Sequence, residues 1–350
     1  MKMKKTQLRT AAVLLTGVLA AGAAAVPASA AAAQQKAGTV VPRLDSAGSG
    51  RVSVKGGQTL PSFTGLRQTG QTKNSASVSW NAVSGASSYI CAYEYYSSDG
   101  QRVNQGRQTV TNPSIQLVGI PTGGMYILYL QASDSAGNYN AASEFRGAAS
   151  LPKVRTIAYW KPFAASSRLQ VAWAPNSYAN QYTAVLYKKS GKKVQTVTVK
   201  SGQNCIAYFS KSNTSTCYTV KLTPKAAGSG LSVTGPSASF YAVPQPKLTS
   251  TKKDVHRNRV ALRWKKVSGA SRYMVYVSPQ KTKRSSTSGM KFKKVATVKG
   301  NRYNLKKYKG KTINTGKRYY YIRVIAVSKY GRKTVKSGSA YYVVAYMKKR

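Results

Sequence analysis

The stretches "ASVSWNAVSGASSYICAY" (residues 76–93) and "VALRWKKVSGASRYMVYV" (residues 260–277) repeat nearly the same pattern within one chain. In the first, Val78 and Trp80 alternate with serines, the turn-rich VSGAS follows, and a second alternation begins at Tyr89. Alternating apolar and polar residues on both sides of a short turn predict two antiparallel strands, each with one buried face.

A third and weaker copy of the pattern lies between these two. In all three copies a tyrosine follows the tryptophan by nine residues, and the tryptophans are 93 and 91 residues apart. A repeat of about ninety residues is a whole small domain rather than a short solenoid unit. Each copy continues with a further alternating run that starts at a tyrosine. The predicted aromatic core is Trp80, Tyr89, Tyr126, Trp173, Tyr182, Tyr218, Trp264, Tyr273 and Tyr320.

From about residue 61 to residue 350, these motifs resemble three tandem fibronectin type III domains. That family places a buried Trp on its second strand, a buried Tyr on its third and a Y-x-V-x-V-x-A run on its sixth. The resemblance implies an all-β fold of tandem antiparallel β-sandwiches with immunoglobulin-like architecture. The family's corner is clearest in the first copy, where Ile120 lies six residues before Tyr126, whereas the middle copy departs from the pattern at Pro224. Many short strands with frequent turns predict a sandwich without the family name as well.

The amino-terminal segment predicts export. Lysines and an arginine precede an apolar stretch from 11 to 26, and Ala28-Ser29-Ala30 has the form of a cleavage site, so residues 1–30 read as a signal peptide. No second apolar stretch follows, and the mature chain is expected to lack a membrane span. The expected location is secreted, extracellular or non-covalently attached to a cell surface, and a Gram-positive bacterium would suit it.

The rest of the chain is expected to divide into four parts. Residues 31–60 read as a flexible lead, because they are rich in Ala, Gln, Gly and Ser. The three domains are expected at 61–150, 151–244 and 245–350. The linker "VPQPK" (243–247) is short and contains proline, which favours a semi-rigid rod.

Three cysteines are present. Cys91 takes an inward position on its strand and is expected to be a small buried hydrophobe. Cys205 and Cys217 flank "IAYFSKSNTST", where strand ends could approach, and a disulfide between them is a hypothesis that the sequence leaves open.

Positive charge increases along the chain, which has a formal net charge of +50. Residues 61–150 hold five basic and four acidic side chains, residues 151–244 hold twelve and none, and residues 245–350 hold 31 and one. Surface ion pairs cannot use so many lysines, and solubility needs only a modest net charge. The asymmetry predicts a polyanionic partner for the third domain.

Two segments of the third domain concentrate this charge. The first is an enlarged hairpin, "SPQKTKRSSTSGMKFKK" (278–294), and the second is "KGNRYNLKKYKGK" (299–311), whose Tyr303 and Tyr308 could either stack on a ligand or cover a sheet edge. Strand alternation also places Arg323 on an outer sheet face. The candidate polyanion-binding residues are Lys281, Lys283, Arg284, Lys291, Lys293, Lys294, Arg302, Lys306, Lys307, Lys309, Lys311 and Arg323.

Catalysis is not expected. The one histidine, His256, lies in a basic loop, and neither a nucleophile motif nor metal-ligand spacing accompanies it. Only the first domain holds several acids, and two of them, Asp99 and Asp134, read as turn residues rather than members of a general acid–base pair. We therefore expect no catalytic, metal or cofactor site.

The sequence favours a secreted, non-catalytic binding or adhesion protein. Its basic third domain would hold an anionic surface polymer such as wall teichoic acid, and its nearly neutral first domain could meet a protein partner. One alternative is a nucleic-acid or glycosaminoglycan (acidic glycan) binder. Another is an accessory spacer of an extracellular assembly. No Arg-Gly-Asp triplet is present to carry over the family's integrin motif.

Overall fold

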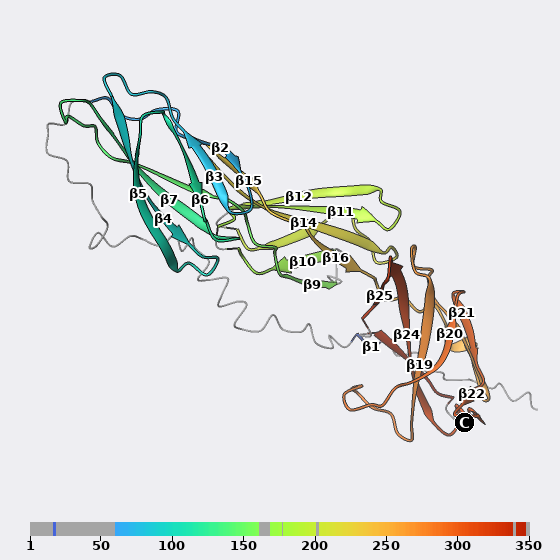
Figure 1. Ribbon diagram of the computed structural model, residues 1–350. Coiled ribbons are helices and arrows are strands. Elements are labelled where there is room, and N and C mark those ends of the chain that lie inside the picture. Colours follow the sequence, from blue (N-terminus) through green and yellow to red (C-terminus); the bar gives the residue numbers. More distant parts are fainter. Residues whose placement is uncertain are drawn as a thin grey trace, which may run out of the picture.

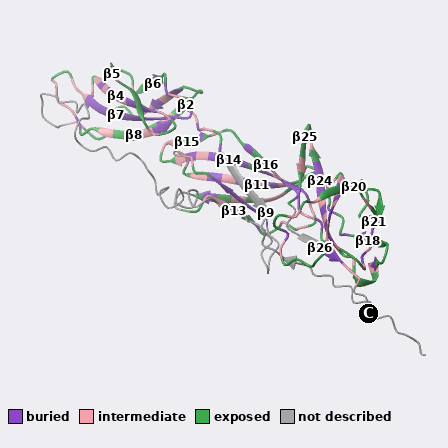
Figure 2. Cartoon of the chain, turned by 90° about the horizontal axis from the view of Figure 1, so that it is seen from below, coloured by how far each residue is buried: buried purple, intermediate pink, exposed green. Residues whose placement is uncertain are grey.

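A computed structural model describes residues 17–18, 60–160, 169–176, 178–200, 203–338 and 341–347. Nearly all regular structure in these residues is β-strand, and three sandwiches follow one another along an elongated molecule (Figures 1 and 2). The predicted all-β fold of tandem antiparallel sandwiches is confirmed. The predicted signal peptide and flexible lead lie outside the described residues, apart from residues 17–18 and Leu60.

The first sandwich packs a three-stranded sheet against a four-stranded one. Their strand orders are β2-β3-β6 and β5-β4-β7-β8, and every pairing is antiparallel. The strands are β2 (Arg67–Gln71), β3 (Ser75–Ser79), β4 (Ser88–Tyr96), β5 (Arg102–Val110), β6 (Ser114–Val118), β7 (Met125–Ser133) and β8 (Ser143–Ala148).

The second sandwich repeats this arrangement with orders β13-β10-β9 and β12-β11-β14, where β15 and β16 both pair with β14. The strands are β9 (Thr156–Trp160), β10 (Leu169–Trp173), β11 (Gln181–Lys188), β12 (Lys193–Lys200), β13 (Ile206–Phe209), β14 (Tyr218–Gly228), β15 (Leu231–Thr234) and β16 (Ala238–Ala242).

The third sandwich has the orders β17-β18-β21 and β26-β24-β19-β20, with β25 also paired to β24. A two-residue strand, β1, extends the second sheet beside β26, and β22 and β23 form a small separate hairpin. The elements are β1 (Gly17–Val18), η1 (Lys252–Asp254), β17 (Val255–His256), β18 (Arg259–Arg263), β19 (Arg272–Gln280), β20 (Lys293–Val298), β21 (Arg302–Leu305), β22 (Lys307–Tyr308), β23 (Lys311–Thr312), β24 (Tyr319–Tyr330), β25 (Lys333–Lys336) and β26 (Tyr341–Ala345).

The repeated sequence pattern builds the same aromatic pair in each core. All nine predicted core aromatics are buried, and none is more than 4% exposed. The indole N–H groups of the three tryptophans have no hydrogen-bond partner among the described residues, so packing holds these rings. The centroid distances are 5.3 Å for Trp80–Tyr89, 5.3 Å for Trp173–Tyr182 and 5.4 Å for Trp264–Tyr273.

A hydrogen bond across the turn accompanies each pair. The tyrosine hydroxyl accepts the backbone N–H of the third residue after the tryptophan. Because a buried N–H without a partner is costly, this bond ties the turn to the strand that follows it. The three bonds are Val83 N–H to Tyr89 at 3.1 Å, Asn176 N–H to Tyr182 at 2.7 Å and Val267 N–H to Tyr273 at 2.8 Å.

The tyrosine corner is distributed differently from the sequence expectation. Tyr218 accepts the Asn213 N–H at 3.2 Å, and Tyr320 accepts the Asn314 N–H at 3.0 Å, as a tyrosine corner requires. In the first sandwich, where the motif is clearest, Tyr126 instead donates to Gln68 Oε1 at 2.7 Å. The middle copy therefore has the corner bond that its sequence obscures.

Pro224 does not interrupt β14, where it pairs with Tyr182 on β11. Its carbonyl accepts the Gly235 N–H at 2.9 Å, which places the edge of Pro224 that lacks an N–H on the side of β15 and β16. On that side the partner of β14 changes from β16 to β15 between Leu222 and Lys225. The missing donor thus coincides with a break in the neighbouring strand.

The second sandwich docks on the first through its β14–β15 hairpin. The Gly230 carbonyl in that turn accepts the Gln68 N–H of β2 at 2.8 Å. Gly230 has φ +68°, and a Cβ there would overlap the Leu66 carbonyl oxygen, so no other residue fits. Tyr178, from the turn between β10 and β11, donates to the Ser97 carbonyl at 2.5 Å.

The third sandwich docks on the second in the same way, through its β24–β25 hairpin. The Tyr330 ring lies 4.3 Å from the Tyr241 ring, and its hydroxyl donates to the Tyr218 carbonyl at 3.2 Å. Lys333 Nζ lies 5.2 Å from the Tyr241 ring and Lys189 Nζ lies 5.7 Å from the Tyr330 ring. These two lysines therefore belong to the junction, a role that no local sequence pattern indicates.

Replacing Tyr273 by Phe tests the hydrogen bond across the turn. The change leaves the buried Val267 N–H without an acceptor, so the unfolding free energy of the third sandwich should fall by about 1–3 kcal/mol. Tyr276→Phe is the control, because its hydroxyl contacts only the Met274 sulfur, at 3.6 Å, among the described residues. Equal losses for both variants in urea unfolding would contradict this role.

Replacing Tyr330 by Ala tests the second junction. The variant should keep its β circular dichroism but give a broader pair-distance distribution in small-angle X-ray scattering, because the change removes the packing of this ring on Tyr241 and its hydrogen bond to the Tyr218 carbonyl. Tyr139→Ala in the first sandwich is the control. Superimposable scattering curves for Tyr330→Ala and the parent chain would show that other contacts fix the junction.

Candidate anionic-polymer interface

The enlarged hairpin presents six exposed basic side chains. They come from the segment between β19 and β20 and from the start of β20, beside the sheet of the third sandwich (Figure 1). Among the described residues, none of them forms a salt bridge. This hairpin group consists of Lys281, Lys283, Arg284, Lys291, Lys293 and Lys294.

Residues 281–292, here called the covering loop, fold back over the outer face of the sheet that contains β24. The Tyr321 hydroxyl accepts the Arg284 N–H at 2.5 Å and donates to the Arg284 carbonyl at 2.8 Å. Tyr321 is 0% exposed and forms an apolar cluster with Val344, Met290 and Phe292. The loop is therefore held to the sheet at both backbone and side-chain level.

The covering loop removes Arg323 from the set of open basic residues. Arg323 does lie on the outer face of β24, but its guanidinium donates to Thr287 Oγ1 at 2.6 Å and lies 4.0 Å from the Phe292 ring centroid. It is partly buried. Strand alternation predicts which sheet face a residue occupies but not which segment covers that face, so this candidate is less open than the others.

A second basic group surrounds the β22–β23 hairpin. Lys309 and Gly310 have φ of 50° and 78°, which is the backbone of a tight two-residue hairpin turn. The turn carries its lysines into solvent, and Lys309 Nζ lies 6.0 Å from the Tyr308 ring. This turn group consists of Lys306, Lys307, Lys309 and Lys311, all exposed.

Tyr303 and Tyr308 are half-buried and pack against the core of the third sandwich. The sequence left open whether these tyrosines stack on a ligand or cover a sheet edge, and these contacts favour the second role. The last candidate, Arg302 on β21, is exposed on the three-stranded sheet. The twelve candidates thus divide into the hairpin group, the turn group, Arg302 and the covered Arg323.

Acidic side chains in the described residues all have local partners. Glu94 binds Arg102 at 2.8 Å and accepts the Tyr96 hydroxyl at 2.7 Å. Hydrogen bonds from Ser97 and Asn138 lower the pKa of Asp99 and of Asp134, respectively. Of the remaining two acids, Glu144 binds Arg146, and Asp254 binds both Thr251 and Arg263.

The third sandwich has only one acidic side chain to set against its 31 basic ones. Its one acid, Asp254, reaches Arg263 at 3.9 Å, where the Arg263 side chain is 68% exposed. Exposed lysines and arginines elsewhere on the sandwich face water. The positive field of this end of the molecule is therefore open to an external anion.

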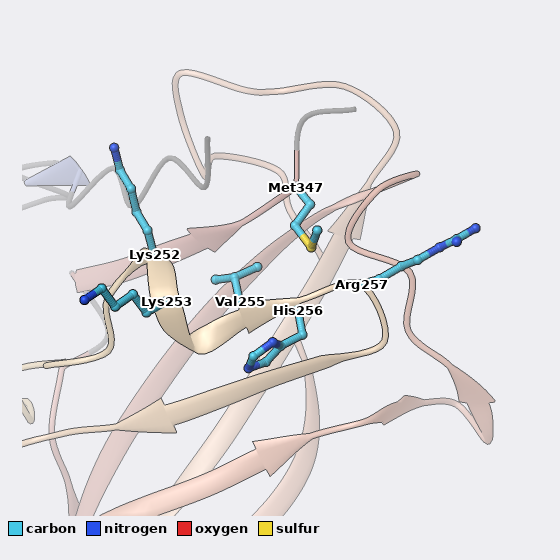
Figure 3. A pocket seen from close by; sticks show the side chains of 6 residues that line it. All are labelled: Lys252, Lys253, Val255, His256, Arg257 and Met347. Atoms are coloured by element: carbon cyan, nitrogen blue, oxygen red, sulfur yellow. The ribbon is translucent and has the colours of Figure 1, made fainter. Parts of the chain in front are cut away.

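His256 lines a pocket of about 380 Å³ near the end of the third sandwich (Figure 3). Lys252, Lys253 and Arg257 also line it, but Figure 3 shows their side chains pointing in different directions rather than converging on one point. His256 Nε2 lies 2.9 Å from Arg259, so the ring is an acceptor for a guanidinium. Among the described residues, no carboxylate lines the pocket to act with this histidine.

Neither a metal centre nor a membrane helix is present within the described ranges. These residues contain no group of three His, Cys, Asp or Glu side chains placed to hold a metal ion. Nor do they form a helix that is long and apolar enough to cross a membrane.

Cys205 and Cys217 are both free thiols, so the hypothetical disulfide is not formed. Cys205 packs against the core of the second sandwich, whereas Cys217 belongs to the buried core of the third. Burial raises the pKa of each thiol to about 11. Sequence spacing could not reveal that the two side chains face different cores. Cys91 is buried, as its strand phase indicates.

No protein-family model and no curated protein matches this sequence. The chain is similar to a two-domain fibronectin type III segment of chicken tenascin, with 18% identity over 52% of this chain and 98% of that one and a TM-score of 0.28. It is similar to the fn3 domain of human collagen alpha-1(XX) (21% identity, 29% and 94% coverage, TM-score 0.24). It is also similar to the FN1–FN3 domains of chicken CNTN1 (14% identity, 83% and 99% coverage, TM-score 0.26). Since these scores are low, the description as fibronectin type III-like rests on the strand orders and the repeated Trp–Tyr pair.

Replacing Tyr321 by Phe tests how the covering loop is held. The variant keeps the ring but loses both bonds to Arg284, so amide hydrogen exchange across residues 281–292 should accelerate by about tenfold, the equivalent of one hydrogen bond. Tyr319→Phe is the control on the same strand. Unchanged exchange in the loop would show that its side-chain packing suffices.

Proposed function

We propose that this chain is a secreted, non-catalytic binding protein that its third sandwich holds to an anionic surface polymer. Wall teichoic acid is the polymer of choice, because a repeating phosphate chain offers many equivalent sites to mobile ammonium groups. The fold by itself does not assign this function. The charge distribution carries the proposal.

The supporting observation is positive charge that lacks internal compensation. Net charge rises from about +1 in residues 61–150, which hold five basic and four acidic side chains, to about +30 in residues 245–350, which hold 31 and one. The hairpin group and the turn group are exposed, and described acids elsewhere are already engaged. A surface of this kind gains binding free energy by replacing its counterions with a polyanion.

The nearly neutral first sandwich has a separate role in this proposal. Held through its third sandwich, the molecule would extend its first one away from the polymer, where it can meet a protein partner. The docked hairpins at both junctions would transmit that geometry. Export through the predicted signal peptide would bring the protein to where a surface polymer is accessible.

A stiff spacer in an extracellular assembly is the second candidate. The two docked hairpins favour it, since Gly230 and Tyr330 each fix one sandwich against the next. A spacer needs no ligand and would pass over charged matrices at physiological salt. Polymer binding explains the basic residues, which a spacer does not require.

The test replaces the hairpin group by Gln in the full chain. Retention on purified Gram-positive walls should weaken, and the slope of log affinity against log salt should fall by about one unit for each phosphate that the variant no longer neutralises. The matched control replaces six exposed basic residues of the second sandwich: Lys153, Arg155, Lys188, Lys192, Lys193 and Lys200.

Three further matrices separate the alternatives. Walls stripped of teichoic acid and a neutral glycan should not retain the parent chain. Equal affinity for DNA would favour a nucleic-acid binder, and no retention on any matrix would favour the spacer. Equal weakening by both six-residue variants would show that total charge, rather than the third sandwich, governs binding.

A further inference from the structure

Two arginines face each other on the three-stranded sheet of the third sandwich. Arg263 on β18 is directly opposite Arg302 on β21. Both are exposed, and both point away from the core because Leu262 and Trp264 beside Arg263 are buried. The covering loop is held on the other sheet of this sandwich, through Tyr321 and Arg323 of β24.

The backbone bonds show that these side chains start close together. Arg263 bonds away from β21: its N–H donates to Ser250 Oγ at 2.7 Å and its carbonyl accepts the Thr249 N–H at 2.8 Å. The next residue, Trp264, donates its N–H to the Asn301 carbonyl across the pair of strands. Arg263 and Arg302 are therefore a non-hydrogen-bonded pair, the type in which Cα atoms are about 4.5 Å apart and side chains are closest.

Like charges placed directly opposite each other destabilise a sheet. Little negative charge offsets the repulsion between these two arginines. One Asp254 oxygen accepts the Thr251 N–H and hydroxyl at 2.7 and 3.2 Å, and the other lies 3.9 Å from Arg263. Arg302 has no side-chain partner among the described residues. An arrangement that costs stability in the free chain can repay it on binding an anion.

We propose that Arg263 and Arg302 together bind one phosphate group. Each guanidinium is a planar fork that can donate two hydrogen bonds to adjacent phosphate oxygens, and a phosphate has enough oxygens to face both forks at once. Asn304, exposed two residues from Arg302 and opposite Ala261, supplies an amide donor on the same face. The pair lies on strands, so the register fixes where the two side chains start before the ligand arrives.

This site deepens the proposed function, and it rests on it in one respect: the phosphate would belong to the polymer that the lysines attract. The roles differ. Lysines on loops attract any polyanion, whereas the paired guanidinium forks select phosphate over a carboxylate, whose two oxygens can satisfy only one fork.

The experiment titrates the full chain with inorganic phosphate at constant ionic strength, with acetate as the comparison, and follows the ¹⁵N-edited Nε–H signals of the arginines. Arg263 and Arg302 should shift together along one saturating curve. Arg263→Lys with Arg302→Lys keeps both charges but removes the forks, and phosphate affinity followed on backbone amides around β18 and β21 should fall about tenfold, the equivalent of one charge-assisted hydrogen bond. Arg318→Lys with Arg332→Lys is the control pair, since both residues are exposed elsewhere on the sandwich.

Linear shifts of equal size at all arginines, or equal phosphate affinity for the Lys pair and the parent chain, would overturn the site. The same variants run on purified walls separate the two proposals. Phosphate-selective wall retention that is unchanged in the Lys pair leaves the proposed function standing and removes this site. Saturable phosphate binding by the pair, without retention of the parent chain on walls, keeps this site and removes the proposed function.

Discussion

The contact between a tryptophan and the tyrosine nine residues later is the constraint on which each sandwich depends. The tryptophan lies at the end of a strand in the three-stranded sheet, and the tyrosine lies on the larger sheet, so their rings join the two layers. The turn between them is fixed by its N–H bond to the tyrosine hydroxyl. An aromatic pair of this kind contributes about 0.5–1.5 kcal/mol beyond the area it buries.

The same turn also sets how the sandwiches meet. In the third sandwich, Ser268 of the VSGAS turn exchanges backbone bonds with Ser215 and Cys217 of the second. In the second, Tyr178 of the corresponding turn reaches Ser97 of the first. The neighbouring hairpins reinforce both contacts, so a local feature of each core is reused as an interdomain joint. An elongated molecule with its basic sandwich at one end follows from this reuse (Figure 1).

The candidate interface illustrates how far sequence reasoning extends to a site. The exposed lysines of the hairpin and turn groups were predictable, because charged side chains in turns and on solvent faces stay in water. The partial burial of Arg323 was not predictable, since the covering loop, held by Tyr321, places Phe292 against its guanidinium. The opposition of Arg263 and Arg302 depends on a strand register that no local pattern specifies.

The sequence by itself determined the strand phase, the repeated Trp–Tyr cores and the gradient of charge, because each of these follows from local periodicity or from counting. Tertiary structure alone decided which cysteines face which core, where the corner bonds form, how the hairpins dock and which basic residues remain open. These features join residues tens of positions apart, as Tyr330 joins Tyr218 and Tyr321 joins Arg284. Their energies depend on packing and register between segments, and such information is absent from the alternation within any one strand.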